Sequence, residues 1–266
     1  MAIVVRIAYW CIITFFKIYA KIACWAIGIL EYISVPLIDS PPLPPVALRY
    51  RVHCSPSRKA FLTVGEITAH TIRQTLQKNN IALDSCKRIL DFGCGCGRTL
   101  RHFSFPAGTS GLYGTDVDAQ AIQWCRHNLP YSQFSLNNPL PPLPYDVESF
   151  DFIYAISVFT HLNEEYQYRW LEELRRVLIS RGVLLMTING SYYQGSLIHR
   201  YIADTKKEGF VFLTSSLWKG IFPDWYQSSY HSREYIFEHY PRFFSIVDYI
   251  PRGLNDHQDV VVLQKP

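Results

Sequence analysis

The most informative stretch of this 266-residue chain reads Ile89-Leu90-Asp91-Phe92-Gly93-Cys94-Gly95-Cys96-Gly97-Arg98. Apolar residues run into an acidic residue and then into a turn in which every second residue is glycine. Glycine has no Cβ, so such a turn lets the backbone approach a bound ligand closely. The spacing differs from the G-x-G-x-x-G pattern that seats a pyrophosphate on a helix N-terminus, because Leu100 occupies the third position of that pattern.

The charge of this turn favours a cationic ligand. Asp91 ends the apolar run, and a carboxylate facing the turn would repel a diphosphate but attract a ligand with an ammonium and a sulfonium group. We interpret Cys94 and Cys96 as small spacers rather than nucleophiles or metal ligands. About twenty residues further on, Gly114-Thr115-Asp116 ends a second apolar strand, where an acidic side chain accepts hydrogen bonds from ribose hydroxyls. Asp118 better suits the alternative role of capping the following helix.

Strand and helix patterns alternate around this turn. Apolar strands are expected over 88–92, 111–115, 133–136, 150–156 and 181–188, and helices over 61–76, from 99 onward, and over 119–129 and 164–178. Such alternation predicts an α/β protein with a parallel, doubly wound sheet. Two further strands, over 243–250 and 260–264, are joined by a short turn, which predicts a final antiparallel pair. The long aromatic-rich segment over about 191–240 is a candidate substrate lid.

The chain is apolar for its length and only mildly basic. It is 48% hydrophobic and 18% charged, with a net charge of +4. No cluster of Lys and Arg indicates a nucleic-acid-binding face, so no nucleic-acid partner is expected. The seven cysteines are odd in number and their spacing does not form a disulfide framework, which favours a reducing compartment.

The first 38 residues hold much of the apolar excess. Arg6, Lys17, Lys21 and Glu31 interrupt the stretch, so no uncharged run approaches the roughly 18–20 residues that span a bilayer. On a helical wheel these charges share a narrow arc, which is typical of an amphipathic helix lying in the membrane interface. The alternatives are a tilted span with snorkelling lysines, a helix packed on the core or on a second copy, and, least favoured, a cleaved signal peptide.

The expected organisation follows from these patterns. It is a membrane-seeking helix over 1–38, a Pro-rich linker over 39–60 and one domain over 61–266. We expect a cytoplasmic protein that is peripheral or monotopic at the inner face of the membrane and that contacts the membrane surface through the N-terminal helix.

The sequence resembles the class I S-adenosylmethionine-dependent methyltransferases, and in particular a bacterial group with the same DFGCGCGR turn. The shared motifs are, as they stand here, Pro44-Pro45 with Leu48-Arg49, the turn at 91–98, Gly114-Thr115-Asp116, Pro141–Tyr145, Ser157–Leu162, Trp170–Leu174, Trp225-Tyr226-Gln227 and His257-Gln258-Asp259. The resemblance runs from about Pro41 to Lys265 and leaves the N-terminal helix outside.

This resemblance implies a Rossmann-like sheet of seven strands in the order 3-2-1-4-5-7-6, with S-adenosylmethionine over the carboxyl ends of strands one, two and four. It implies that Asp91 and Gly93 hold the methionyl part, that Asp116 holds the ribose, and that Asn137 lies near the adenine. Ala155 would close strand four beside the donor. The donor-binding residues expected in total are Asp91, Gly93, Cys94, Gly95, Gly97, Asp116, Val117, Asn137 and Ala155.

Methyl transfer from a sulfonium is an in-line displacement, in which alignment and exclusion of water matter most. An oxygen or nitrogen acceptor also benefits from a general base. The candidate bases are His161, His231, His257 and Asp259, each of which also suits a structural role. Strand four is not followed by the Asp/Asn/Ser-Pro-Pro-aromatic element of enzymes that methylate the exocyclic amines of bases, and no Asp, Asn and His cluster resembles a magnesium site.

We therefore expect metal-free methyl transfer to a small-molecule, lipid-linked or glycan-linked acceptor. The apolar lid suits an apolar or amphipathic acceptor, although a hydrophobic core would use the same residues: Phe210, Phe212, Trp218, Phe222 and Trp225. A donor-binding but catalytically silent scaffold or regulatory protein at a membrane is the alternative. The glycine spacing argues against a third function, an oxidoreductase that uses a nicotinamide or a nucleotide sugar.

Overall fold

The computed structural model describes residues 41–103, 111–190, 192, 209–214 and 227–266, together with parts of the stretch between 22 and 30. The helices of this part are α2 (Val46–His53), α3 (Arg58–Lys78), α4 (Ala119–Asn128), α5 (Glu164–Val177) and α7 (Arg233–His239), with short 3-10 turns at η1 (Leu83–Ser85), η2 (Leu100–His102) and η5 (Tyr240–Arg242). Its strands are β1 (Arg88–Phe92), β2 (Gly111–Asp116), β3 (Gln133–Leu136), β4 (Phe150–Ala155), β5 (Leu178–Ile188), β6 (Phe210–Leu213), β7 (Ser228–His231), β8 (Ser245–Leu254) and β9 (Gln258–Gln264).

Seven of these strands form one sheet in the order β3-β2-β1-β4-β5-β9-β8. The first five pair in parallel, and β9 runs antiparallel to both of its neighbours, β5 and β8. The expected order 3-2-1-4-5-7-6 with a final antiparallel pair is therefore confirmed, with β8 and β9 as strands six and seven. The strands β6 and β7 form a separate antiparallel pair, which the sequence did not predict.

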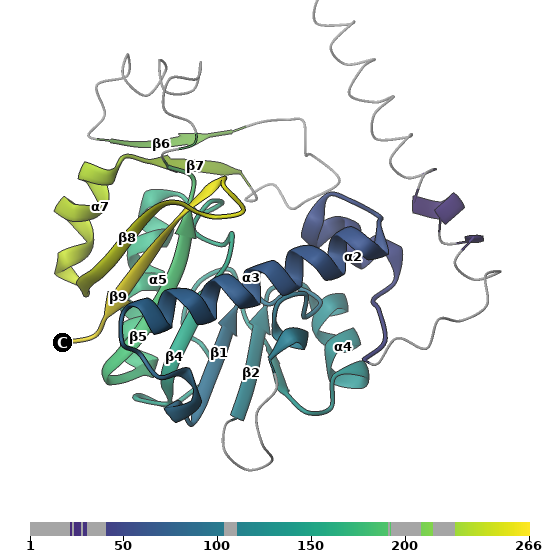
Figure 1. Cartoon of the computed structure of the whole chain (residues 1–266), viewed down its shortest axis with the longest axis horizontal. Helices are drawn as coiled ribbons and strands as arrows, with labels where there is room; N and C mark the ends of the chain where they lie inside the picture. Colours follow the sequence, from purple (N-terminus) through teal and green to yellow (C-terminus); the bar gives the residue numbers. More distant parts are fainter. Residues whose placement is uncertain are drawn as a thin grey trace, which may run out of the picture.

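Helices cover both faces of the sheet (Figure 1). One hydrophobic cluster joins α3 and α4 to the sheet through residues such as Ile72, Leu76 and Ile122. A second cluster joins α5 and α7 to the opposite face through Trp170 and Ile236. Because the central strands β1, β4 and β5 lie between these clusters, they are nearly continuous runs of buried residues, as is usual for parallel strands.

Polar side chains begin several of the helices. Asp118 accepts hydrogen bonds from the amides of Gln120 (3.0 Å) and Ala121 (3.2 Å), which caps α4. The sequence had favoured Asp118 over Asp116 for this role, and the structure confirms it. Ser57 caps α3 in the same way, which explains why that helix begins earlier than the expected 61–76.

The segment over 39–60, expected to be a Pro-rich linker, is folded against the domain in its described part. The segment contains α2, and the side chain of Arg49, a residue of this helix, is buried. Its guanidinium group donates hydrogen bonds to the carbonyl of Pro44 (2.5 Å) and to that of Pro56 (3.0 and 3.2 Å). The prolines therefore supply carbonyl acceptors to a buried cation in addition to stiffening the chain.

Other expectations are met only in part. The helix expected from Thr99 onward is limited to the single turn η2, and 104–110 lie outside the described residues. Most of the candidate lid over 191–240 also lies outside them, including Trp218, Phe222 and Trp225. The same holds for most of the expected helix over 1–38. Within the part of the chain that the structure describes, no helix is both long enough and apolar enough to cross a bilayer.

Candidate functional site

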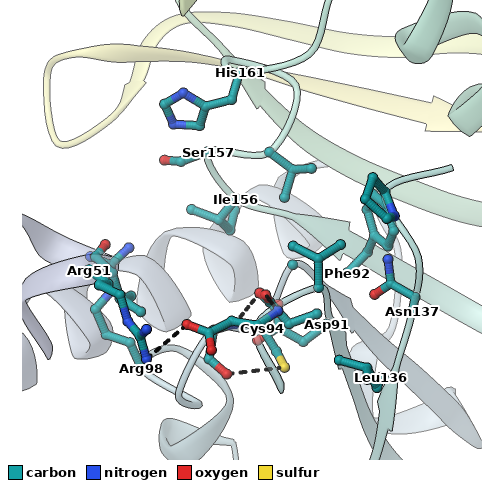
Figure 2. Close-up of a pocket in the computed structure, with 18 of the residues that line it drawn as sticks. Arg51, Asp91, Phe92, Cys94, Arg98, Leu136, Asn137, Ile156, Ser157 and His161 are labelled. Carbon is teal, nitrogen blue, oxygen red and sulfur yellow. Dashed lines mark hydrogen bonds and ion pairs between the residues drawn. The ribbon is translucent and has the colours of Figure 1, made fainter. Parts of the chain in front are cut away.

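A pocket of about 760 Å³ lies at the carboxyl ends of β1, β2 and β4. Ligands of open α/β sheets bind at this edge, and the volume falls within the roughly 300–1,000 Å³ of small-molecule sites. The turn after β1 forms its floor, and the walls come from the segments that follow β2, β3 and β4 and from α2 (Figure 2).

The glycine turn has a backbone conformation that requires glycine. Gly93 and Gly95 have φ angles of +80° and +52°, in the left-handed region. A Cβ on Gly95 would lie 2.7 Å from Cγ2 of Val52, and one on Gly93 would collide with Val158. The turn is thus packed between α2 and the loop after β4, and a ligand at its surface contacts all three segments.

Asp91 lies at the floor of the pocket (Figure 2). Its side chain is buried, and Oδ2 has no hydrogen-bond partner among the described residues. The Tyr154 hydroxyl lies beside this carboxyl group. Burial raises the pKa of Asp91 to about 8, although Tyr154 and Arg98 favour the ionised form. A buried carboxyl group in this state is suited to a ligand that brings a cation.

Asp116 ends β2 beside the turn. Its Oδ2 accepts a hydrogen bond from the amide of Gly95 (2.7 Å), and its Oδ1 accepts one from the amide of Asp118 (2.8 Å). Burial raises the pKa of Asp116, while these backbone hydrogen bonds act in the opposite direction. The two bonds fix the direction of the carboxylate, which can accept further hydrogen bonds from a ligand in the pocket.

Leu136 and Asn137 form another wall of the pocket, across from Arg51 and Arg98 (Figure 2). The Leu136 side chain is 47% exposed and offers an apolar surface to a flat ring. Oδ1 of Asn137 accepts a hydrogen bond from the Thr115 hydroxyl (2.8 Å), and its Nδ2 donates to the carbonyl of Asn138 (2.7 Å). Asn137 therefore lines the pocket as expected, with its side-chain amide already engaged by the protein.

His161 is the one candidate base that lines the pocket in the described part of the chain. Its Nδ1 lies 2.6 Å from the backbone carbonyl of Gln227. A carbonyl oxygen can only accept, so Nδ1 carries the proton and the ring lone pair is on Nε2. Burial lowers the pKa of His161 to about 4, although the Gln227 carbonyl acts in the opposite direction. The imidazole is therefore neutral at physiological pH.

The other two candidate histidines are not among the residues that line this pocket. His231 is 3% exposed, and its Nε2 lies 2.9 Å from Oε1 of Gln167. Burial lowers the pKa of His231 to about 3, and the side chain belongs to the contact between β7 and α5. His257 lies in the turn between β8 and β9, where its ring packs against Tyr192 with 4.6 Å between centroids.

Asp259, the fourth candidate base, also has a structural environment. Its side chain is fully buried. Oδ1 accepts a hydrogen bond from the amide of Arg252 (2.7 Å), and Oδ2 accepts one from the Tyr249 hydroxyl. Asp259 therefore joins β8 to β9 rather than facing the pocket.

Two expected donor-binding residues also lie outside the pocket lining. A Cβ on Gly97 would lie 2.5 Å from Cδ1 of Leu129, so this glycine allows the turn to pack against the end of α4. Ala155 is fully buried at the end of β4, and the residues after it form the wall instead. The remaining seven expected residues line the pocket: Asp91, Gly93, Cys94, Gly95, Asp116, Val117 and Asn137.

Several pocket residues were not expected from the sequence. Arg51 and Val52 belong to α2, in the segment interpreted as a linker, and Arg51 forms an ion pair with Asp118 (3.1 Å). Ser157 follows β4 and has a φ of +58°. The only available signals were the shared motifs that contain or flank these residues, 44–49 and 157–162.

Residues 90–186 match the family model of a methyltransferase domain. Phthiotriol/phenolphthiotriol dimycocerosates methyltransferase 1 of Mycobacterium ulcerans (strain Agy99) is 32% identical over 105 residues, which cover 39% of this chain and 38% of that protein. Probable phthiotriol/phenolphthiotriol dimycocerosates methyltransferase 2 of the same strain is 30% identical over 100 residues, which cover 37% of this chain and 38% of that protein. The chain thus spans less than two fifths of the length of these curated relatives.

Solved structures share the fold. A structure of S-adenosylmethionine-dependent methyltransferases from Methanosarcina mazei has a TM-score of 0.54 at 20% identity and covers 71% of this chain and 96% of that chain. The structure of geranyl diphosphate methyltransferase in complex with GPP and sinefungin has a TM-score of 0.51 at 9% identity and covers 75% of this chain and 79% of that chain. At these identities the likeness establishes the fold alone.

Proposed function

We propose, from the methyltransferase domain matched over residues 90–186, that the chain is a class I S-adenosylmethionine-dependent methyltransferase and that it transfers a methyl group to a small-molecule, lipid-linked or glycan-linked acceptor. The pocket at the carboxyl ends of β1, β2 and β4 supports this function. So does the match to a methyltransferase domain, which begins at residue 90, within β1, and ends at residue 186, within β5.

The observation that carries the proposal is the buried carboxyl group of Asp91, whose Oδ2 lacks a partner. An ammonium group on the ligand supplies both the missing charge and the missing hydrogen bond. Asp116 is placed to accept hydrogen bonds from ribose hydroxyls, and Leu136 offers an apolar surface to the adenine ring. When bound, S-adenosylmethionine supplies an electrophilic methyl group on a sulfonium.

His161 is the candidate general base that the geometry supports best. The Gln227 carbonyl fixes the ring, and the neutral ring keeps its lone pair on Nε2 at physiological pH. A base in this state can take the proton of an acceptor as the new bond forms, and the carbonyl stabilises the imidazolium that results. The proton is then released readily, because burial disfavours the charged ring.

A lipid-linked acceptor is one of the proposed classes, and two observations favour it. The curated relatives are named for lipid acceptors, phthiotriol and phenolphthiotriol dimycocerosates. In the N-terminal stretch, Trp25 is 70% exposed and Ile22 is 57% exposed, which suits a segment that lies in a membrane interface. Both observations support a reaction next to a membrane that holds the acceptor.

A transfer experiment in a cell extract tests this function. The full chain is incubated with S-adenosylmethionine and with lipid and water-soluble fractions, and mass spectrometry follows molecules that become one methylene unit heavier. We expect a product that depends on both the protein and the donor and that disappears with Asp91→Asn. Donor binding without a product in any fraction would instead favour the catalytically silent alternative.

A further inference from the structure

Two polar side chains from the loop after β4, Ser157 and His161, line one end of the pocket. Figure 2 shows the Ser157 hydroxyl and the His161 ring projecting to the same side, with Ile156 between them and the Asp91 floor. Asp91, a proposed donor-binding group, thus lies at one level of the pocket. The serine and the histidine lie at the next.

Ser157 is held in an unfavourable backbone conformation. Its φ of +58° lies in the left-handed region, where residues with a Cβ are uncommon. Two side chains from other strands maintain it. The amide of Ser157 donates to the Thr187 hydroxyl on β5 (2.8 Å), and the Ser157 hydroxyl donates to Oε1 of Gln258 on β9 (3.0 Å). Strain maintained in this way occurs most often at binding sites and active sites.

These hydrogen bonds determine what the pocket offers to a second molecule. The Ser157 proton is directed at Gln258, so the serine oxygen presents lone pairs. The Nδ1 proton of His161 is directed at the Gln227 carbonyl, so this ring also presents a lone pair, on Nε2. Gln227 and Gln258 each belong to a motif shared with that bacterial group, Trp225-Tyr226-Gln227 and His257-Gln258-Asp259, and neither glutamine was a candidate site residue.

We propose that Ser157 and His161 form an acceptor site that selects a neutral hydroxyl group, with Gln258 as the positioning residue that orients Ser157. The inference rests on the proposed methyltransferase function. A hydroxyl group donates a hydrogen bond to such a site, whereas a carboxylate or phosphate oxygen has no hydrogen to donate and meets lone pairs instead. The described lining at this end holds no carboxylate that would attract an ammonium group.

In the transfer, the acceptor oxygen forms a bond to the methyl carbon while the bond from that carbon to sulfur breaks. The electron pair of the broken bond stays on sulfur, which leaves as a neutral thioether. The hydroxyl proton passes to Nε2 of His161, and the product is a methyl ether. The Ser157 oxygen accepts a hydrogen bond from the molecule that is methylated. This bond comes either from the reacting hydroxyl group before transfer or from a second O–H or N–H group of the same molecule.

The type of bond that carries the label tests this inference without the identity of the acceptor. The full chain is incubated with S-adenosylmethionine tritiated in its methyl group and with lipid and water-soluble extracts. We expect label that survives mild alkali, does not bind a cation exchanger and is released as methyl iodide by hydriodic acid, which identifies a methyl ether and excludes a methyl group on carbon. Label released as methanol, from an ester, or retained as an amine overturns the hydroxyl inference and leaves the methyltransferase function standing. No label in any fraction overturns that function, and the inference with it.

Two variants test the roles of Ser157 and Gln258. Ser157→Gly removes the hydroxyl and tolerates the left-handed backbone, and Gln258→Met removes the acceptor oxygen at similar length. Each should lower the labelling rate about tenfold or more, while calorimetric affinity for S-adenosylmethionine changes by less than about twofold. Gln258→Glu keeps an acceptor oxygen and should restore most of the rate. Gln264→Met, on the same strand but bonded to the Arg181 carbonyl, is the matched control and should behave as wild type.

If the Ser157→Gly variant labelled the acceptor at the wild-type rate, Ser157 would not be part of the acceptor site. If Gln258→Glu were as impaired as Gln258→Met, Gln258 would have a structural role rather than an orienting one. Loss of donor affinity in either variant would place the pair in the donor site instead.

Discussion

At the scale of single residues, donor binding depends most on Asp91. Its carboxyl group is buried and its Oδ2 lacks a partner, and burial raises its pKa to about 8. In the ligand-free protein the group is therefore mostly protonated at pH 7. A bound ammonium group favours the carboxylate and lowers this pKa, so donor binding displaces the proton.

Donor affinity should consequently rise with pH. Well below pH 8 we expect on the order of a tenfold gain per pH unit, levelling off near pH 8, with a proton released as the donor binds at pH 7. Calorimetry in two buffers of different ionisation enthalpy measures this release. Asp91→Asn should bind the donor weakly and without pH dependence. An affinity that stays constant between pH 6 and 8 would contradict this role of Asp91.

The raised pKa of Asp91 also makes the free energy of unfolding depend on pH. The folded ligand-free protein holds the Asp91 proton more tightly than the unfolded chain does, because the pKa is about 8 against an ordinary value near 4. This contribution to the free energy of unfolding is fully present below pH 4 and is lost as the pH rises toward 8. Asp91→Asn should remove that dependence from thermal unfolding curves, whereas Asp151→Asn, on a neighbouring strand, should retain it.

The sequence predicts those site residues whose role is local. The glycine turn, Asp91 and Asp116 follow from strand ends and from a spacing of about twenty residues. His231 and Asp259 could not be placed in this way, because the partners that bury them, such as Gln167 and Tyr249, lie elsewhere in the chain or on a neighbouring strand. Their chemistry suits a base, and only the folded structure excludes them from the pocket.

At the scale of elements, α2 is the part of the pocket that sequence patterns missed. The helix has eight residues and follows a Pro-rich stretch, so local propensity predicts a linker there. Its position comes from long-range contacts instead. Arg49 binds two proline carbonyls, and Arg98 donates to the carbonyl of Val52 (3.3 Å). The result is a wall of the pocket that touches the glycine turn at Gly95.

The substitution Arg49→Met should loosen the packing of α2 against the rest of the domain. The substitution leaves the carbonyls of Pro44 and Pro56 without their charged donor, which we expect to cost about 1–3 kcal/mol in the free energy of unfolding. Amides of α2 should exchange hydrogen faster, and the donor should bind more weakly. Arg175→Met, on an exposed position of α5, is the control. Unchanged exchange in α2 would mean that other contacts hold this helix.

At the scale of the whole molecule, alternation of strands and helices predicts the parallel sheet, and the resemblance adds its strand order. Both are confirmed. The strands β1, β4, β5 and β9 carry strong apolar patterns, whereas β3 is weak and has Phe134 as its one buried residue. The pair β6 and β7 was missed, since each strand has only four residues and the two are paired across a long separation in sequence.

Membrane binding by the N-terminal stretch stays a prediction, and it is tested on the full chain. Wild-type protein should sediment with vesicles of phosphatidylglycerol and phosphatidylethanolamine, because the stretch combines apolar and cationic side chains. Trp25→Asp together with Ile22→Asp should reduce that binding without changing donor affinity. Val147→Asp, at a comparably exposed position of the domain, is the control. Equal sedimentation of all three proteins would contradict the prediction.

Calorimetric titration of the full chain with S-adenosylmethionine and with NAD, repeated on Asp116→Ala, tests the central claim most directly. The carboxylates at the pocket favour a cationic ligand over a diphosphate. We predict saturable binding of S-adenosylmethionine at one site, no binding of NAD, and an affinity for the donor that falls about tenfold or more in Asp116→Ala. Binding of NAD that is lost in Asp116→Ala, with no binding of S-adenosylmethionine to either protein, would contradict the account.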